Sequence, residues 1–392
     1  MPARPTTLVA FGVLSFTYFA TIGLFNPYAP LWFKELGYST LAIGALASLQ
    51  NWTRVVAPYA WAWLGDHGGR RTELLRLSAW LSLLASLGLL YFEQYAAVAV
   101  VTALLFLSNG GIVPLSEAAL SQQLASTPQG LDAGRYGRVR VWGSAGFIAA
   151  VVSCGFVLQS FGVRLFPGLV VATLVLMLLA TLRLPVAHAE RPRGASSPAV
   201  WSVLRQPRIA WFFASVFSTV LAHSSLYVFL SLYLDGLGYG KAAVGALWGI
   251  GVAAEIAFFW FQGHWFHRLS AHQWLQVAAG VAVLRFAATA AFGQHAAVLV
   301  AAQALHAVTF AAHHAACIML LHRYFAGPLR GRGQALYTTL GYGLSGVVGG
   351  LGGGWLCSHF GFAAVFWAAS LAAALGVWCA RRSARLETLE VL

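Results

Sequence analysis

Charged residues are scarce in this sequence, and their scarcity decides the class of protein. Asp, Glu, Lys and Arg together make up 9% of the 392 residues, whereas a soluble domain carries about 25%. Hydrophobic residues make up 59% of the chain, and the mean hydropathy is +0.73. A soluble core cannot use so much apolar surface, so a soluble globular domain is excluded. The composition predicts an integral membrane protein.

Cysteine pairs, nucleotide loops and histidine boxes are also missing. The four cysteines fall in apolar runs without a Cys-x-x-Cys pair, which argues against metal and disulfide roles. No GxxxxGK[ST] loop occurs, so direct drive by ATP is not expected. His313 and His314 stand alone rather than in repeated boxes, so a diiron membrane desaturase is not expected either. The sequence therefore predicts no cofactor, no metal, no catalytic residues and no enzymatic activity.

The formal net charge of +13 does not indicate a nucleic-acid partner, because the basic residues are sorted by loop. With the N-terminus placed in the cytoplasm and the loops counted in turn, the opposite side receives only Lys34, Arg164 and Lys241. Arg54 and Arg285 fall inside apolar runs, and the other basic residues fall on the cytoplasmic side. This positive-inside distribution predicts cytoplasmic termini in a bacterial inner membrane, with contact to anionic lipids.

Apolar runs of about 20 residues, long enough to cross a bilayer as a helix, recur along the chain. The first is too long for a secretory signal and has no small-residue cleavage site, so we expect it to be retained as a span. The pattern predicts an all-α integral membrane protein with twelve transmembrane helices. The expected spans are 8–32, 41–64, 73–92, 96–124, 141–161, 164–184, 209–233, 242–262, 273–292, 297–322, 335–357 and 362–380.

A polar stretch from Arg183 to Arg208 divides these spans six and six. It is rich in Pro, Ser, Ala and Arg and has no apolar periodicity, as is typical of a flexible linker. We therefore expect an N-terminal six-helix bundle at 1–184, a cytoplasmic linker at 185–208 and a C-terminal six-helix bundle at 209–392.

The two halves contain an internal repeat. "LWFKELGYSTLAIGAL" from Leu31 aligns with "LYLDGLGYGKAAVGAL" from Leu232, an offset of 201 residues. Both read as the end of a span, a Leu-Gly-Tyr turn and the start of the next span. A weaker echo pairs "QSFGVR" with "SHFGFA". The same offset places Arg54 and Glu255 at equivalent positions of equivalent helices, which suggests a repeat-related pair of pseudo-symmetric bundles.

Polar residues inside apolar runs are costly and mark functional sites by default. In the run 297–322, helical spacing predicts that His306, Phe310, His313 and Cys317 share one face and that His314 is turned away. The full set of polar candidates in the spans is Asn26, Gln50, Asn51, Arg54, Asn109, Glu117, His223, Glu255, Arg285, His306, His313 and His314.

Proton coupling is the chemistry that the titratable members of this set favour. A carboxylate whose contact with an arginine changes between two states can take up and release a proton. Imidazole titrates near neutrality and can connect the two. The residues expected to couple protons are Glu255, Arg285, His306, His313 and Glu117.

Substrate binding is the second expected role. The planar guanidinium of arginine meets both oxygens of a carboxylate, so we expect Arg54 or Arg285 to clamp a carboxylate, and aromatic side chains to pack against a ring. The expected substrate-binding residues are Arg54, Arg285, Glu117, Asn109, Trp61, Tyr227 and Trp248.

Structural roles remain open for the same residues. Glu255 and Arg285 can form a buried pair, and Glu117 can pair with Arg140 near the cytoplasmic end. His313 and His314 can each serve as a hydrogen-bonding group between helices. For His223, Asn26 and Asn51 we expect a structural role rather than ligand binding.

The segment "LGDHGGRR" resembles the cytoplasmic loop signature of the major facilitator superfamily. Asp66, Gly69, Arg70 and Arg71 match it, whereas His67 fills a position that is usually basic. The second-half counterpart, "HWFHRLSA", is degenerate. The resemblance implies two six-helix halves, a substrate site at the midplane between them, and a loop that latches the cytoplasmic side when it closes.

A closer resemblance covers most of the chain. "LSFTYFATIGLFNPYAPLWFKELGYS", "YGRVRVWGSAGFI", "LWGIGVAAEI", "VLRFAA" and "ALHAVTFAAHHAA" are similar to the phenylpropionate permease group, which is akin to the lactose permease and nucleoside–proton symporters. The resemblance implies proton-coupled secondary transport, and it matches Glu255 and Arg285 to the charged set on the eighth and ninth helices of sugar permeases.

We therefore expect a monomeric secondary transporter that imports a small organic solute with a proton, and we expect the solute to be an aromatic carboxylate such as 3-phenylpropionate. One alternative is a nucleoside or sugar symporter, which would rely more on Asn and Gln than on arginine. An alternative from another class is a membrane sensor that binds the solute without transporting it.

Overall fold

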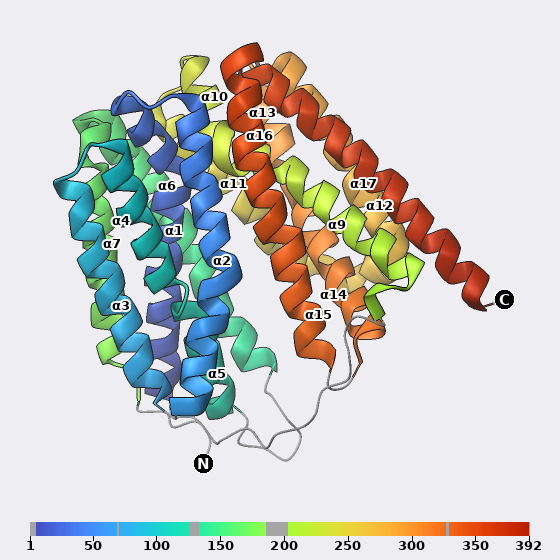
Figure 1. Ribbon diagram of the computed structural model, residues 1–392, viewed down its shortest axis with the longest axis horizontal. Helices are drawn as coiled ribbons and strands as arrows, with labels where there is room; N and C mark the ends of the chain where they lie inside the picture. The colour runs from blue at the N-terminus through green and yellow to red at the C-terminus, as the bar shows by residue number, and fades with distance from the viewer. Residues whose placement is uncertain (1–4, 69, 125–132, 186–202, 327–328, 392) are drawn as a thin grey trace. The chain divides into compact units, whose positions relative to one another are not determined.

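The protein is all-helical in the computed structural model, which describes residues 5–68, 70–124, 133–185, 203–326 and 329–391 (Figure 1). No β-strand occurs among these residues, so the predicted all-α class is confirmed. Most of the expected linker, 185–208, lies outside the described residues.

The first half of the chain contributes seven α-helices to the described residues. They are α1 (Pro5–Glu35), α2 (Thr40–Gly68), α3 (Arg71–Leu87), α4 (Tyr95–Asn109), α5 (Ile112–Leu124), α6 (Ala133–Phe161) and α7 (Phe166–Leu182).

The described residues of the second half form α-helices and three π-helical segments that interrupt them. The α-helices are α9 (Pro207–Ser224), α10 (Leu230–Gly236), α11 (Lys241–Phe261), α12 (Ala271–Phe292), α13 (Ala296–Ala304), α14 (His313–Tyr324), α15 (Arg330–Leu336), α16 (Ser345–Phe360) and α17 (Phe362–Val391). The π-helical segments are η3 (Ser225–Phe229), η6 (Ala307–Ala312) and η8 (Tyr337–Leu344).

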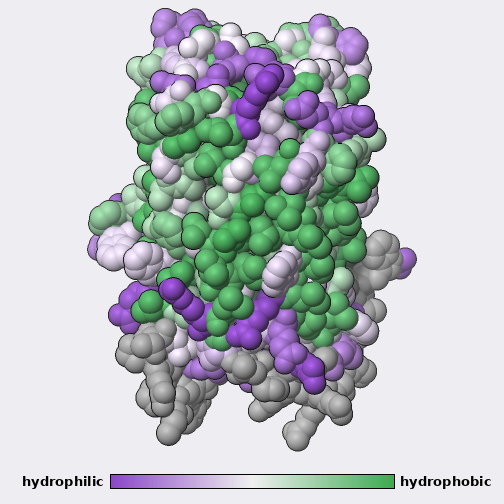
Figure 2. Space-filling view, turned by 90° about the vertical axis from the view of Figure 1, so that its left-hand side faces the viewer, coloured by the Kyte–Doolittle hydropathy of each residue, from purple (hydrophilic) through white to green (hydrophobic). Residues whose placement is uncertain are grey.

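Ten helical segments of the described chain are long and apolar enough to cross a membrane. They correspond to ten of the twelve expected spans. The other two, 41–64 and 335–357, fall on α2 and on the continuous segment from α15 through α16. Polar residues in the first and glycines in the second lower the hydropathy of these helices. On the face shown in Figure 2, hydrophobic side chains form a broad band between two hydrophilic ends, as a lipid-facing surface requires.

The described helices group into two compact units. In the first, α1 packs against α6 and α7, and α3 packs against α4, α5 and α7 (Figure 1). In the second, α9 packs against α16 and α17, and α12 packs against α14 and α17. The first unit comprises Met1–Tyr38, Trp52–Gly194 and Gly240–Gly249, and the second comprises Ser39–Asn51, Ala195–Tyr239 and Ile250–Leu392.

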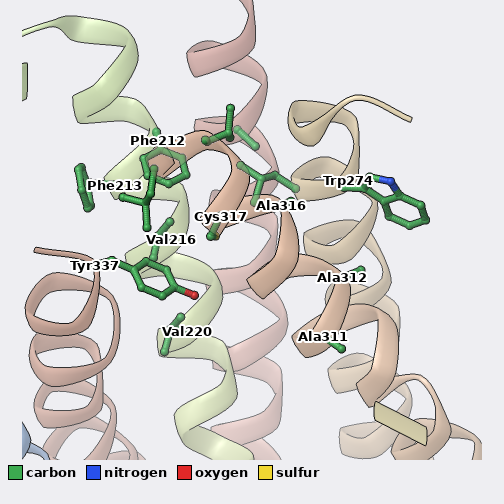
Figure 3. Packing of buried hydrophobic residues seen from close by; sticks show 14 of the residues in the cluster. Phe212, Phe213, Val216, Val220, Trp274, Ala311, Ala312, Ala316, Cys317 and Tyr337 are labelled. Atoms are coloured by element: carbon green, nitrogen blue, oxygen red, sulfur yellow. The ribbon is translucent and has the colours of Figure 1, made fainter. Parts of the chain in front are cut away.

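Each unit is held together by a buried apolar core. In the first, Phe25 packs edge-to-face on Phe106 with the ring centroids 4.8 Å apart. In the second, side chains of α9 such as Phe212 and Val216 pack against the η6–α14 segment and against Tyr337 (Figure 3). Within a bilayer such contacts stabilise a bundle through van der Waals packing, and small residues allow the helices to approach closely.

The internal repeat is visible in the structure. Gly37 and Gly238, 201 residues apart, both adopt positive φ, +82° and +86°, a conformation that favours glycine. The tyrosines that follow them make the same hydrogen bond. Tyr38 donates its hydroxyl to the carbonyl oxygen of Glu93 at 2.7 Å, and Tyr239 donates to that of Gln294 at 3.0 Å. The repeat found in the sequence is therefore confirmed in these two turns.

Two helices are divided between the units. The start of α2 belongs to the second unit and the start of α11 belongs to the first, whereas the rest of each helix belongs to the other unit. In the second unit, Gly44 of α2 lies so close to Gly350 of α16 that an added Cβ would collide with its carbonyl group. Ser48 donates to the carbonyl oxygen of Val347 at 3.0 Å. In the first unit, Gly245 of α11 lies equally close to the carbonyl of Val151. Gly44 and Gly245 are again 201 residues apart, so the repeat places glycine at both close crossings.

A polar cluster ties the end of α17 to the second unit. Glu387 is 5% exposed and accepts a hydrogen bond of 2.5 Å from the hydroxyl of Tyr324. His272 Nε2 lies 2.6 Å from Glu387 Oε2, and Arg323 Nη1 lies 2.6 Å from Oε1. The cluster joins α17 to the first turn of α12 and the last turn of α14.

Candidate functional site

The candidate site of the second unit is a largely buried row of three charged or titratable side chains, in which Glu255 keeps 17% of its side chain exposed. Glu255 of α11 places Oε1 2.9 Å from Nε2 of His306. Nδ1 of the same imidazole lies 2.8 Å from Nη1 of Arg285 on α12. Arg285 is 1% exposed and His306 is 5% exposed. The structure thus brings together three of the four residues expected to couple protons in this half, with the histidine between the two charges. The fourth, His313, is not part of the row.

The donor and acceptor of each bond in this row follow from the chemistry of its ends. A guanidinium can only donate, so His306 Nδ1 accepts from Arg285. A neutral imidazole then carries its hydrogen on Nε2, which donates to Glu255 Oε1. The arrangement suits an ionised Glu255, since the carboxylate then balances the guanidinium charge through a neutral ring.

Four further residues complete the site. Thr309 accepts from Arg285 Nη1 at 2.8 Å, and Gln303 Oε1 lies 3.4 Å from Arg285 Nη2. His223 Nε2 lies 3.1 Å from the Thr309 hydroxyl. Gly251, one turn before Glu255, faces Gln303 and His306 and leaves room for them. Sequence reasoning missed Gln303 and Thr309, although both lie three positions from His306, and it favoured a structural role for His223.

The burial of Arg285 limits what it can bind. Nη1 carries two hydrogens, and these meet His306 and Thr309. The guanidinium also lies over the ring of Phe286, with Cζ 5.3 Å from the centroid. A group enclosed in this way acts as an internal counter-charge, which a buried carboxylate needs.

The predicted helix face of the span containing His306 is wrong, because η6 interrupts the α-helix. A π-helical turn adds one residue, so that positions beyond it are displaced by one. His306 stacks on Phe310 at 5.2 Å, and Phe310 stacks on His314 at 6.2 Å. His314 therefore continues the column that His306 begins, and His313 is turned away from it.

His313 lies instead in the apolar core of the second unit. It is 3% exposed, and its ring nitrogens lie 3.7 and 3.8 Å from the sulfur of Cys317. His314 Nδ1 lies 2.9 Å from the hydroxyl of Tyr337. Tyr227 of η3 packs edge-on to His306 at 6.3 Å, so this expected substrate-binding aromatic borders the row.

The first unit contains a second charged pair. Arg140 of α6 donates to Glu117 of α5 at 2.8 Å, and both side chains are partly exposed. The Arg140 guanidinium also lies 5.7 Å from the ring centroid of Phe19. The pair lines a cavity of about 40 Å³ between α1, α5 and α6, together with Tyr18. Of the readings left open for Glu117, the pairing with Arg140 is the one observed.

Arg54 of α2 is half-buried in the same unit. It makes no hydrogen bond or ion pair with any residue whose side chain the structure describes, and Tyr18 lies within its electrostatic range. Trp61 donates its indole N–H to the carbonyl oxygen of Leu107 at 2.8 Å, which ties it to α4. Asn109 is buried at the end of α4.

Trp248 is the last of the expected substrate-binding residues. It is 7% exposed and packs within the first unit against Phe147 of α6, with the ring centroids 6.3 Å apart. Among the described residues, no three His, Cys, Asp or Glu side chains form a group that could hold a metal ion.

The loop signature between α2 and α3 is described only in part. Gly69 and the side chain of Asp66 lie outside the described residues. Arg71 begins α3, and Arg70 Nη1 lies 3.4 Å from Glu73 Oε2 with both groups exposed. An acidic residue in the first turn of a helix also favours the helix dipole.

Comparison with known proteins agrees with this architecture. A model of the MFS_1 like family matches residues 8–368. Over 387 residues the chain is 32% identical to an Escherichia coli (strain K12) protein named "Probable 3-phenylpropionic acid transporter", covering 95% of this chain and 96% of that protein. It is 31% identical over 260 residues to the maltose permease of Geobacillus stearothermophilus, covering 64% and 60% of the two chains.

Solved structures show the same fold at low sequence identity. A variant of the nucleoside transporter NupG superposes with a TM-score of 0.83, at 18% identity, over 97% of this chain and 99% of that one. A peptide transporter POT in complex with sulfate superposes with a TM-score of 0.81, at 12% identity, over 98% and 97%. The chain therefore belongs to the MFS_1-like family and is a secondary transporter of the major facilitator superfamily.

Proposed function

We propose that this transporter imports a small organic solute together with a proton, and that the solute is an aromatic carboxylate such as 3-phenylpropionate. The observation that carries the coupling is the buried row of Glu255, His306 and Arg285. The substrate class is supported by the name of the Escherichia coli relative and by Arg54, a cation that no described side chain neutralises.

Glu255 is the proposed proton carrier. When it is ionised, its charge balances Arg285 through the neutral ring of His306. When it is protonated, the guanidinium remains in a buried site without a counter-charge, which is costly. Proton uptake therefore favours a different arrangement of the second unit, and a ligand that prefers that arrangement is bound more tightly once the proton is on. His306 is the proposed relay between the two charges.

Arg54 is the proposed clamp for the solute carboxylate. Arg285 has both Nη1 hydrogens engaged, and Arg140 is paired with Glu117. Among the side chains that the structure describes, Arg54 alone of these three arginines has no hydrogen-bond or ion-pair partner, so we propose that its donors serve a ligand. A guanidinium and a carboxylate form two parallel hydrogen bonds, which gives both affinity and orientation. Tyr227 and Trp248 remain the proposed aromatic contacts.

The family and the charge distribution support a proposal for the membrane setting. We propose a monomer in a bacterial inner membrane with both termini in the cytoplasm. Bundles at 1–184 and 209–392, joined by the linker 185–208, would alternate access to the solute. Asp66, Gly69, Arg70 and Arg71 would latch the cytoplasmic side.

The test uses purified protein in liposomes with radiolabelled 3-phenylpropionate. We expect solute counterflow without any gradient, and accumulation against the solute gradient when the outside is made acidic. Cinnamate, uridine and maltose serve as competitors at equal concentration. Competition by cinnamate alone supports the proposal. Competition by uridine or maltose alone would instead assign a nucleoside or sugar symporter, and binding without counterflow would assign a solute sensor.

A further inference from the structure

Thr309 lies at the centre of the second unit's site, although no role has been assigned to it. It is fully buried, and its hydroxyl oxygen lies 2.8 Å from Arg285 Nη1 and 3.1 Å from His223 Nε2. A hydroxyl has one hydrogen to donate and two lone pairs to accept with. The partners on its two sides therefore decide which way it points.

The tautomer of His223 determines which group donates in the hydrogen bonds of Thr309. Its Nδ1 lies 2.8 Å from the backbone carbonyl oxygen of Thr219, and a carbonyl can only accept, so Nδ1 carries the hydrogen. In the neutral ring Nε2 then accepts, and the Thr309 hydroxyl donates to it at 3.1 Å rather than to the backbone carbonyl oxygen of His306, which lies farther away at 3.5 Å. The lone pairs of Thr309 are left facing Arg285. His223 thus turns Thr309 into an acceptor for the guanidinium.

Arg285 Nη1 has two hydrogens that diverge in the guanidinium plane, and the structure gives each an acceptor at 2.8 Å, Thr309 Oγ1 and His306 Nδ1. When Thr309 holds one hydrogen, the other is directed at His306. Nδ1 of His306 must then stay without a hydrogen, and the ring places its N–H on the side that faces Glu255.

We propose that Thr309, oriented by His223, is a positioning residue that sets the tautomer of His306 and so directs its N–H toward Glu255. The proposal rests on the proposed function, since it concerns how the coupling row is arranged. Other titratable or charged groups reach this region from each neighbouring element: Glu255 from α11, Arg285 from α12, Tyr227 from η3 and His313 from α14.

Removal of the Thr309 hydroxyl should free Arg285 to turn away from His306. Nη1 would keep only one acceptor, and Gln303 Oε1, 3.4 Å from Nη2, already offers the guanidinium another. Once the guanidinium turns toward Gln303, His306 Nδ1 is free to carry the hydrogen. Nε2 then faces Glu255 as an acceptor and can no longer donate to the carboxylate.

The test compares Thr309→Val, which keeps the shape but removes the hydroxyl, with Thr309→Ser, which retains it. Thr289→Val is the matched control, because the Thr289 hydroxyl is buried on α12 but donates only to the backbone carbonyl of Arg285. Thr309→Ala repeats the experiment should the valine variant not fold. Each protein is labelled with ¹⁵N-histidine, and the signals of His306 are identified by their loss in His306→Asn.

In wild type, Thr309→Ser and Thr289→Val, we expect the ¹⁵N spectrum of the Nε2–H tautomer. In Thr309→Val we expect the Nδ1–H tautomer and a fall in proton-driven accumulation of at least about tenfold, equivalent to about 1.4 kcal/mol, with counterflow retained. An unchanged tautomer in Thr309→Val would overturn the proposal, as would an equal change in Thr289→Val. Failure of wild type to accumulate solute would count against the proposed function alone, because the tautomer is read without transport.

Discussion

Glu255 and Arg285 are linked through a single imidazole: His306 Nε2 lies 2.9 Å from the carboxylate and His306 Nδ1 lies 2.8 Å from the guanidinium. The two charges therefore do not form a direct salt bridge of the kind that merely stabilises a bundle. A change in the protonation of one residue in this row therefore alters the hydrogen bonds of the other two, which lie on different helical segments. This relationship leads to the first prediction.

Glu255→Gln should abolish accumulation against a gradient while counterflow persists. The amide keeps the shape of the side chain but cannot exchange a proton, so solute still equilibrates and is no longer driven. Accumulation under an inward proton gradient and counterflow at equal pH are measured in the same liposomes. Glu35→Gln, at an exposed helix end, is the control and should behave as wild type. Wild-type accumulation in Glu255→Gln would remove this residue from the coupling mechanism.

Arg54→Ala should weaken binding of the aromatic acid much more than binding of its neutral amide. A hydrogen bond to a charged group contributes about 1.5–3 kcal/mol, which corresponds to a loss of roughly 10- to 100-fold in affinity. Affinities are obtained by competition in the counterflow assay. Arg164→Ala, an exposed arginine that pairs with Glu35, is the control. Equal losses for the acid and the amide would argue against a carboxylate clamp.

Gly44→Ala and Gly245→Ala should each lower the thermal stability of the protein in detergent. At both sites a new Cβ meets a backbone carbonyl of the adjacent helix, and overpacking of this kind costs about 1–3 kcal/mol. Gly280→Ala on α12 is the control, because its Cβ meets no atom within 4 Å and alanine favours the helix. If all three variants melt together with wild type, the close crossings contribute no specific packing constraint.

Glu387→Ala should destabilise the second unit. The carboxylate is buried among Tyr324, His272 and Arg323. Its loss removes the acceptor that these residues share and leaves the part-buried Tyr324 and His272 only their mutual contact of 3.1 Å, at a cost of about 1–3 kcal/mol. Arg323 is largely exposed and can turn to water, which keeps the cost at the lower end. Thermal unfolding in detergent measures the effect, and Glu35→Ala is the exposed control. An unchanged melting temperature would show that the cluster is dispensable.

Much of the architecture could be predicted from local patterns. Hydropathy alone located the spans, because every backbone group in a bilayer core must be paired within its own helix. The offset of 201 residues predicted equivalent turns, and Tyr38 and Tyr239 make equivalent hydrogen bonds. Glu255, Arg285 and His306 were selected because an ionisable residue in an apolar helix needs a partner, and the three are in contact.

The helix face of His313 could not be predicted in the same way. Face assignments assume an unbroken α-helical period, and a π-helical turn displaces every later residue by one position. The segment Ala307–Ala312 has no glycine or proline that would signal such a turn. The packing of this segment among neighbouring helices determines where the π-helical turn forms. Only the structure therefore shows that His314, and not His313, lies in the column with His306.

The sequence by itself determined that the protein lies in a membrane, that it is helical and that its halves repeat. It also determined the short set of polar residues from which a site can be built. Each of these depends on composition and spacing along one chain. The tertiary structure decided which members of that set meet. Gln303 and Thr309 are ordinary polar residues in sequence, and only the approach of α12 to the segment from α13 to α14 makes them partners of Arg285. Hydrogen bonds depend on distances of a few tenths of an ångström between elements far apart in the chain, and no local pattern encodes those distances.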